Sequence, residues 1–325
     1  MQWNHKVFGL KEADFEAVAL EVFSFQSANN PVYKEYLSAL NVNILSVKSL
    51  NQVPFLPIRF FKSHDVTTTL FEPEAIFESS GTTGSINSRH LVKDISLYEE
   101  SFIKGFQQCY GSINEYCIIG LLPSYMERKN SSLVYMVDKL VQLSEHPQSG
   151  FYLDEYEKLF IILNKLEKWK QKTLLIGVTF ALLDFAEKFS LPLNNTIIME
   201  TGGMKGRREE LIRAEVHEKL SKSFGVKQVH SEYGMTELLS QAYSKGEGVF
   251  NCPPWMKILV RDEEDPFVIK ENGSGVINVI DLANIYSCSF IATDDAGKVN
   301  ADGSFEVLGR IDGSDLRGCS LMVLP

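Results

Sequence analysis

Thr173-Leu-Leu-Ile-Gly177 and Thr196-Ile-Ile-Met-Glu200 are two short apolar runs on either side of a segment with helical spacing, Phe180 to Phe189. Apolar runs of this length predict buried strands. A strand, a helix and a second strand in this order are typical of a parallel sheet, because the chain must cross back before the next strand can begin. The sequence therefore predicts an α/β protein.

The same alternation continues on both sides of this segment. Helical spacing and short apolar runs follow one another through most of the first 249 residues, so we expect several parallel strands flanked by helices. The further expected elements are helices over 11–25, 32–40, 97–110, 154–170 and 207–224, and strands over 116–122 and 227–230. The apolar segment Val53 to Lys62, interrupted by prolines, fits either a core strand or the wall of a pocket.

The sequence changes character after Phe250. Short β-type runs over 257–261, 276–281 and 304–308 are separated by turn sequences such as Glu271-Asn272-Gly273. We expect one core domain over 1–325, with α/β sheets to about 249, a small β-rich subdomain over about 250–315 and a tail over 316–325.

Composition excludes several classes of protein. The net charge of −10 and the pI near 5.2 argue against a nucleic-acid surface, which needs clustered basic residues. No apolar stretch reaches the length of a membrane span, and the N-terminus does not resemble a secretory signal. Five scattered cysteines fit reduced thiols better than a disulfide framework, so we expect a cytoplasmic protein.

A loop of small residues, Ser79-Ser80-Gly81-Thr82-Thr83-Gly84, follows the apolar run that ends at Phe77. Glycines let successive backbone amides turn inward around phosphate oxygens, and hydroxyls add further donors. The alternative is an ordinary surface loop rich in Ser, Thr and Gly.

Three further clusters have the chemistry of a nucleotide site. In Ser231 to Glu237, Tyr233 offers a ring for a base and Glu237 a carboxylate for Mg²⁺, although the run also fits a capped helix start. Asp295 and Arg310 suit ribose and phosphate oxygens, or form only a surface ion pair. The pair Gly202-Gly203 permits close approach of a flat ring, or a tight turn.

The order of these motifs is similar to that of the adenylate-forming superfamily of acyl-CoA synthetases. Within it, the segments Leu121 to Tyr125, Val229 to Glu237 and Leu316 to Ser320 most resemble the acyl-protein synthetases of the LuxE type. Those are the fatty-acid-activating subunits of bacterial bioluminescence reductases. The resemblance implies the large N-terminal core of an adenylate-forming enzyme, with parallel sheets flanked by helices.

The resemblance also implies a role for each matching residue. ATP phosphates would bind at Ser80, Gly81, Thr82, Thr83 and Gly84. Tyr233 and Gly234 would lie at adenine beside Gly202 and Gly203, and Asp295 would take the ribose hydroxyls. Thr236 would lie at the α-phosphate, Glu237 would bind Mg²⁺, and Arg310 would contact ribose or phosphate.

The chain departs from the family pattern in three places. The usual phosphate-loop lysine is missing, although Arg89 follows the loop and could supply its charge. Asp294 stands where the ribose motif normally has glycine. The sequence ends at Pro325, so we expect the mobile C-terminal domain with its catalytic lysine to be absent.

Cys319 occupies the place where LuxE-type proteins carry their acyl group, so the resemblance makes it a candidate acyl acceptor; the alternative is a buried cysteine in a last strand. His230 fits a hydrogen-bonded core residue better than a pocket residue. His90 fits the same description, with a slight preference for the phosphates because it follows the loop.

The leading interpretation is an ATP- and Mg²⁺-dependent ligase that activates a carboxylic acid and passes the acyl group to a protein cysteine. The apolar wall Phe55, Leu56, Ile58, Phe60 and Phe61 suggests a fatty or aromatic acid. Expected partners are an acyl reductase, an acyltransferase or a carrier protein. Two alternatives stay open: transfer to coenzyme A or a carrier protein, as in phenylacetate–CoA ligases, and a non-catalytic module that only binds nucleotide or acyl groups.

Overall fold

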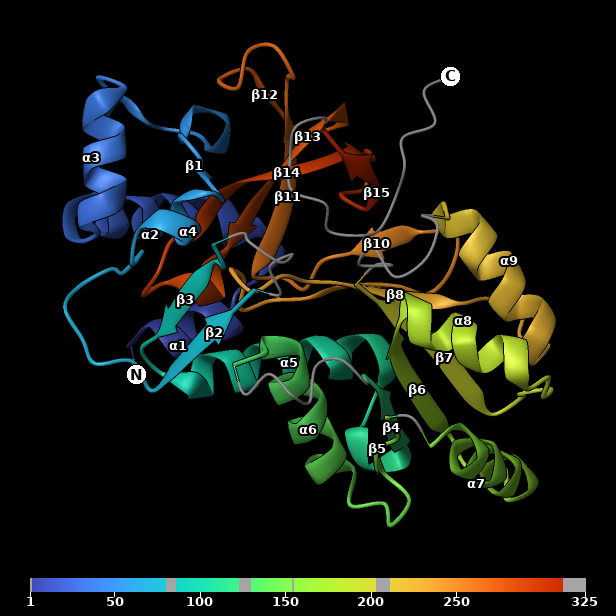
Figure 1. Cartoon of the computed structure of the whole chain (residues 1–325). Helices are drawn as coiled ribbons and strands as arrows, with labels where there is room; N and C mark the ends of the chain where they lie inside the picture. The colour runs from blue at the N-terminus through green and yellow to red at the C-terminus, as the bar shows by residue number, and fades with distance from the viewer. Residues whose placement is uncertain (1, 80–85, 123–129, 154, 203–210, 312–325) are drawn as a thin grey trace. The chain divides into compact units, whose positions relative to one another are not determined.

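The computed structural model describes residues 2–79, 86–122, 130–153, 155–202 and 211–311 (Figure 1). They form two compact units whose segments interleave along the chain. The first unit comprises residues up to 105, 234–242 and 251 onward to 311, and the second comprises 106–233 and 243–250. The boundary between the units therefore falls between Tyr233 and Gly234, inside one of the predicted motifs.

The second unit contains a parallel sheet in which β8, β7, β6, β4 and β5 are neighbours in this order. Its central strands β4 and β6 are apolar and buried along their whole length, as parallel strands covered by helices usually are. The helices of this unit flank the sheet in Figure 1. The strands are β4 (Cys117–Leu121), β5 (Gly150–Phe151), β6 (Thr173–Val178), β7 (Thr196–Thr201) and β8 (His230–Tyr233), followed by β9 (Ala242–Ser244) and β10 (Val249–Asn251).

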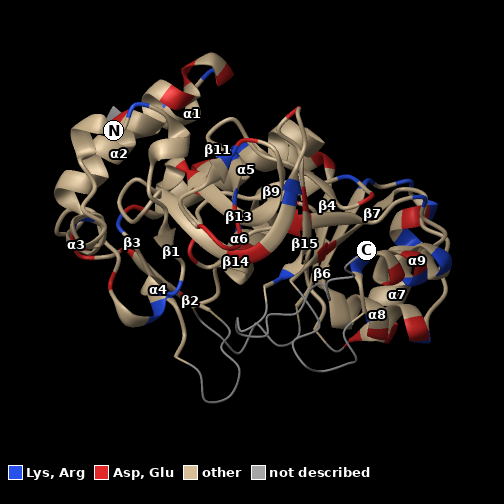
Figure 2. Cartoon of the chain, turned by 90° about the horizontal axis from the view of Figure 1, so that it is seen from above, with Lys and Arg blue, Asp and Glu red and all other residues tan. Residues whose placement is uncertain are grey.

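Several helices of the second unit bury one apolar stripe and leave the opposite face more exposed. In α7, for example, Leu159 and Leu163 are buried, while charged residues of both signs lie on α7 and α9 in Figure 2. This pattern is that of a surface helix packed on a sheet. These helices are α6 (Ser132–Ser144), α7 (Tyr156–Lys168), α8 (Thr179–Lys188) and α9 (Arg213–Phe224).

The first unit contains a mainly antiparallel sheet in the order β12-β11-β13-β14-β15, with β1 added parallel to β14. Its strands are β1 (Leu56–Pro57), β11 (Met256–Arg261), β12 (Ile269–Lys270), β13 (Gly273–Asp281), β14 (Phe290–Val299) and β15 (Phe305–Arg310). Buried Gln26 joins the N-terminal helices to this sheet region, because its side chain bonds the carbonyls of Asn284 and Ile285 and the amide of Ser289. The helices are α1 (Gln2–Phe8), α2 (Phe15–Asn29), α3 (Pro31–Ala39), α4 (Phe60–Ser63) and the first part of α5 (Ile95–Tyr110), whose residues from Phe106 belong to the second unit.

A separate hairpin in the first unit holds the predicted phosphate loop. It consists of β2 (Ala75–Glu78) and β3 (Arg89–Val92), which pair antiparallel. Beyond the paired strands, the amide of Ser79 donates to the carbonyl of Ser88 at 3.0 Å, and the amide of Ser88 donates to Oγ of Ser79 at 2.8 Å. The loop therefore begins and ends at a fixed pair of serines.

The predicted α/β class is confirmed, including the parallel strands and the β-rich part near the C-terminus. Several boundaries differ from expectation, and two of these differences have a clear physical reason. The strand predicted over 227–230 instead runs from His230 to Tyr233, because β8 pairs with the end of β7, where Thr201 lies beside Glu232. In the segment over 53–62, only Leu56–Pro57 are strand before the chain turns into α4. The single-domain prediction stays a prediction.

Candidate active site

Asp295 and Arg310 lie opposite each other on β14 and β15, and Nε of Arg310 is 3.3 Å from Oδ1 of Asp295. The Asp295 side chain is mostly buried. A β-bulge follows directly, between Ala296 and Gly297. Bulges commonly re-aim side chains next to active sites. The two residues of the predicted ribose motif are thus brought together across one strand pair.

The backbone that carries Asp295 is held by neighbouring polar groups. The hydroxyl of Thr293 donates to the carbonyl of Ile277 at 2.8 Å and accepts from the amide of Asp295 at 3.2 Å. Arg261 donates to the carbonyl of Thr293 at 2.6 Å and to Oδ1 of Asn278 at 2.7 Å. Because charged donors make strong hydrogen bonds, Arg261 fixes the position of the strand that presents Asp295.

Asp294, the departure from the family pattern, forms an ion pair with a residue from the N-terminal segment. Its Oδ2 lies 3.2 Å from Nε of Arg59, whose side chain is 59% exposed. The adjoining residues of that segment run along β14, with Leu56 beside Ile291. The aspartate therefore links this segment to the middle of β14, next to Asp295.

Thr236 and Glu237 lie in a turn, so the alternative of a helix start at this point is wrong. Nδ1 of His90 is 2.8 Å from the carbonyl oxygen of Thr236, and Nδ2 of Asn284 donates to the carbonyl of Glu237 at 2.7 Å. The Glu237 side chain is fully buried. The carbonyls of Thr236 and Glu237 are thus both bound by side chains from elsewhere in the same unit.

The carboxylate of Asp281 fixes the residues that follow. It accepts from the amides of Leu239 and Ser240 and from the hydroxyl of Ser240, at 2.8, 3.0 and 2.6 Å. Burial raises the pKa of Asp281, an effect that these hydrogen bonds oppose. The turn at Thr236 and Glu237 is therefore followed by a segment with fully bonded amides.

In the second unit, Gly202 and Tyr233 occupy the carboxyl ends of neighbouring parallel strands. Ligands of α/β proteins bind at this edge. Gly202 has a φ of +62°, which favours glycine, and its carbonyl accepts from the hydroxyl of Thr179 at 2.6 Å. The ring of Tyr233 packs edge-on to Phe250 with centroids 6.0 Å apart.

Two glutamates lie beside these residues. Glu200 on β7 accepts from Nε of Arg213 at 3.2 Å, and Nε2 of His217 is 3.6 Å away. Glu232 on β8 accepts from the hydroxyl of Thr201 at 2.5 Å. Burial raises the pKa of Glu232 to about 7, despite that hydrogen bond, and the charge of Glu200 adds to the rise.

Two other predicted residues have clear surroundings. Nδ1 of His230 lies 3.1 Å from the hydroxyl of Tyr110, and burial lowers the pKa of His230 to about 4, which fits the hydrogen-bonded core interpretation. Arg89 is exposed, and its NH1 lies 3.0 Å from Oδ1 of Asp65. Its charge is therefore shared with a carboxylate next to the phosphate-loop hairpin.

The predicted apolar wall packs largely into the core of the first unit. Phe55 lies edge-on to Phe290, and Phe61 lies edge-on to His90, with centroids 6.1 and 5.9 Å apart. Leu56 and Ile58 are buried, and Phe60 is half-buried. The wall thus shows the core packing that was the alternative to a pocket.

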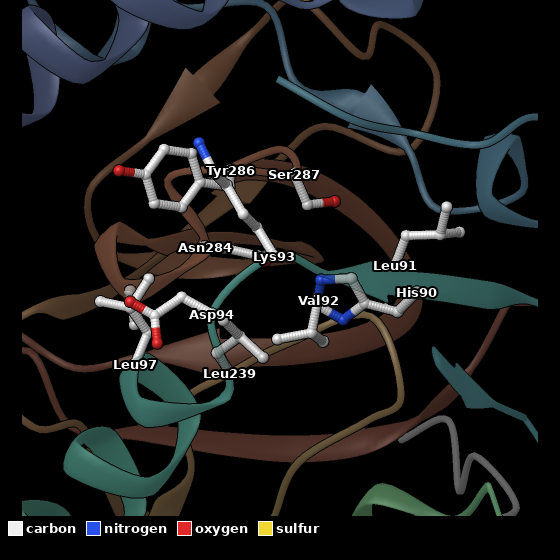
Figure 3. A pocket seen from close by; sticks show the side chains of 11 residues that line it. His90, Leu91, Val92, Lys93, Asp94, Leu97, Leu239, Asn284, Tyr286 and Ser287 are labelled. Carbon is white, nitrogen blue, oxygen red and sulfur yellow. The ribbon is translucent and has the colours of Figure 1, made fainter. Parts of the chain in front are cut away.

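A shallow, partly open pocket in the first unit has a cavity volume of only about 10 Å³ (Figure 3). Its polar lining includes His90, Asp94, Asn284 and Ser287. Lys93 also lines it, with Nζ 4.1 Å from the ring centre of Tyr286. Ser80, Gly81, Thr82, Thr83 and Gly84, as well as Gly203 and Cys319, lie outside the described residues.

Sequence reasoning did not identify Arg59, Arg261, Asp281 or Asn284. Each acts on a motif far away in the chain, so no local pattern marks it. The place of His90 after the loop is visible in the sequence, but its bond to Thr236 spans 146 residues and has no sequence signal.

The fold is that of adenylate-forming enzymes. The structure of 2-hydroxyisobutyryl-CoA ligase matches with a TM-score of 0.66 at 12% identity, covering 94% of this chain and 71% of that one. MatB from Rhodopseudomonas palustris matches with a TM-score of 0.55 at 20% identity, covering 73% of this chain and 48% of that one. The chain thus aligns with about half the length of MatB.

Residues 8–324 match the family "Acyl-protein synthetase, LuxE". The chain belongs to this enzyme family, as the order of its motifs predicted. A relative from Vibrio harveyi, named long-chain-fatty-acid–luciferin-component ligase, is 23% identical over 92% of this chain and 84% of its own length. Among the described residues, no helix combines the length and apolar character needed to cross a membrane.

Proposed function

We propose that this chain activates a fatty acid with ATP and passes the acyl group to a thiol. In the first step a carboxylate oxygen attacks the α-phosphorus, the bond to pyrophosphate breaks, and acyl-adenylate forms. In the second step a thiolate attacks the acyl carbon and AMP leaves. Family membership supports this reaction, and the Asp295–Arg310 pair is the observation that carries it.

Each described residue of the family motifs has a proposed role in nucleotide binding. Asp295 accepts the ribose hydroxyls, and Arg310, which is paired with that carboxylate, contacts ribose or phosphate oxygens. Tyr233 stacks on adenine, and Gly202 gives the ring room because it has no side chain. Such a reaction depends on positioning and charge neutralisation, with no protein nucleophile needed in the first step.

Mg²⁺ fits the donor chemistry of Glu237. Its carboxylate is a hard oxygen ligand, and Mg²⁺ is usually held by one or two carboxylates together with substrate phosphates. Within the described ranges, no three His, Cys, Asp or Glu side chains form a group that could hold a metal ion. When bound, Mg²⁺ neutralises phosphate charge.

The acceptor thiol is proposed to be Cys319 rather than one of the cysteines that the structure describes. Burial raises the pKa of Cys117 to about 11 and that of Cys288 to about 12. Burial also raises the pKa values of Cys109 and Cys252. Because the thiolate is the nucleophile, these four thiols are poor acceptors near neutral pH. A fatty acid as substrate is supported by the name of the Vibrio harveyi relative.

The first experiment is ATP–pyrophosphate exchange with purified protein, Mg²⁺ and a panel of fatty and aromatic acids. We expect exchange that depends on the acid and is fastest with long-chain acids. ATP binding measured by calorimetry, without exchange for any acid, would contradict the enzymatic proposal and favour a binding module.

The acceptor is tested separately with radiolabelled acid. Cys319→Ser should retain exchange and lose covalent labelling of the protein, with Cys109→Ser as a matched control that keeps its label. Labelling of Cys319→Ser would show that the cysteine assignment is wrong. Acceleration of turnover by coenzyme A or pantetheine would point to a free thiol as acceptor.

A further inference from the structure

We propose that His90 is a positioning residue for adenylation, which holds the Thr236–Glu237 turn against the phosphate-loop hairpin. The inference rests on the proposed function, since it concerns the two residues assigned to the α-phosphate and to Mg²⁺. It adds a residue that the family motifs do not include.

His90 is rigidly placed on the buried face of the hairpin. It pairs with Phe77 across β2 and β3, is 1% exposed, and lies edge-on to the ring of Phe61. Figure 3 shows its ring beside Val92 and Leu91, at the wall of the pocket that Asn284 also lines. A ring enclosed in this way has little freedom to turn, so its bond to the motif has a fixed direction.

The hydrogen bond defines which ring nitrogen carries the proton. The carbonyl of Thr236 can only accept, so Nδ1 of His90 must be the donor at 2.8 Å. Burial lowers the pKa of His90, although the hydrogen bond to Thr236, the charge of Glu237 and the side chain of Asn284 oppose that effect. A neutral ring with its proton on Nδ1 is therefore favoured.

Asn284, which follows the Thr236–Glu237 turn in the chain, binds the turn as well. It ends the short helix η5 (Leu282–Asn284) and binds the next carbonyl, that of Glu237, at 2.7 Å. Two consecutive carbonyls are thus bound by two fully buried side chains. With both carbonyls fixed, the peptide planes that orient Thr236 and Glu237 are fixed as well.

The polar ring of His90 supplies the Thr236 carbonyl with a hydrogen-bond donor, which an apolar side chain could not do. An apolar side chain would pack equally well, but it would leave the Thr236 carbonyl without its donor, which costs about 1–3 kcal/mol when buried. The bond also joins β3, the strand that leaves the phosphate loop, to the turn proposed to serve the metal. Hence a shift of β3 would move the Thr236–Glu237 turn through the His90 side chain, and a shift of the turn would move β3.

The test compares three substitutions of His90. Asn places its amide nitrogen where Nδ1 stands, Gln places it one bond farther from the backbone, and Leu removes the donor. Thr68→Val is the matched control, because it also removes a buried side-chain bond to a carbonyl of the first unit, that of Ser287 at 2.5 Å. Each variant is measured for exchange kcat, KM for MgATP and thermal unfolding.

We expect His90→Leu to lower kcat about 10- to 100-fold, as expected for one buried hydrogen bond. His90→Asn should recover most of this loss and His90→Gln much less, while Thr68→Val keeps its kcat despite a lower Tm. Equal kcat in all variants would overturn the proposal, as would a Thr68→Val loss as large as that of His90→Leu. If the Leu variant does not fold, the contrast between Asn and Gln decides.

Calorimetry separates this inference from the proposed function. If the wild type binds ATP but shows no exchange, the proposed function fails. The positioning role of His90 is then tested by comparing the affinities of wild type and His90→Leu for MgATP and for ATP in EDTA. Weaker MgATP binding in His90→Leu, with ATP binding unchanged, would support the positioning role. Unchanged binding of both would overturn it, and a wild type that binds neither form would overturn both proposals.

Discussion

Asp295 and Arg310 face each other across the β14–β15 pair, with Nε of the arginine 3.3 Å from Oδ1 of the aspartate. The pair joins two sequence motifs separated by a turn and a bulge. Both side chains are largely buried, so the ion pair is less screened than one at an open surface. The carboxylate of Asp295 is the proposed acceptor for the ribose hydroxyls.

Replacing Asp295 with Ala should weaken ATP binding about 10- to 100-fold, since it removes charge-assisted hydrogen bonds worth about 1.5–3 kcal/mol. The measurement is calorimetry with ATP and 2′-deoxy-ATP. The wild type should prefer ATP, and the variant should bind both equally. A variant that keeps the preference would show that the ribose is bound elsewhere.

Asp294→Gly restores the residue usual in the family motif and removes the ion pair with Arg59. Because the Arg59 side chain is largely exposed, a double-mutant cycle with Arg59→Ala should give a coupling of about 0.2–1 kcal/mol in chemical unfolding. ATP affinity should stay close to that of the wild type. A tenfold weaker affinity would instead show that Asp294 takes part in nucleotide binding.

Glu237→Gln should abolish Mg²⁺-dependent exchange while the protein stays folded, since the two side chains have nearly the same shape and only the carboxylate charge is lost. Titration of Mg²⁺ at constant ATP gives the readout, with circular dichroism as the control for folding. Exchange at the wild-type rate would refute the assignment of the metal to this residue.

The free energy of unfolding should fall as the pH rises from about 4.5 to 7. The reason is Glu232, because burial raises its pKa to about 7 in the folded protein. Below this window the carboxyl is protonated in both states. As the pH rises through it, the unfolded chain ionises first and is favoured, by up to about 3 kcal/mol. Glu232→Gln cannot ionise, so its free energy of unfolding should exceed that of the wild type increasingly across the window. Parallel pH curves for the two proteins would contradict the raised pKa.

Gly177→Ala should destabilise the fold by about 1–3 kcal/mol, because an added Cβ would lie 2.9 Å from Cγ of Leu182 and 3.1 Å from Cβ of Leu121 in a fully packed core. Urea unfolding measures this effect. Leu182→Ala should cost less in the Gly177→Ala background than alone, since the new methyl group fills part of the cavity. Additive effects would show that the two residues do not share this space.

Local sequence patterns were sufficient to predict the α/β class, because strand and helix periodicities are local properties. The apolar runs at 173–177 and 196–200 both became parallel strands. The strand near His230 was shifted by three residues, since its position depends on pairing with β7, which the sequence of β8 alone does not encode. The short β1 is similar: it is a strand because β14 lies beside it.

The sequence by itself determined the family, the order of the motifs and the residue types that suit a nucleotide. These follow from chemistry that each motif carries within a few residues. The tertiary structure decided what holds those motifs: Arg59 on Asp294, Arg261 on the Thr293 carbonyl, and His90 and Asn284 on the carbonyls of Thr236 and Glu237. Such contacts join residues up to 235 positions apart, and only packing of the whole chain brings their donors and acceptors within bonding distance.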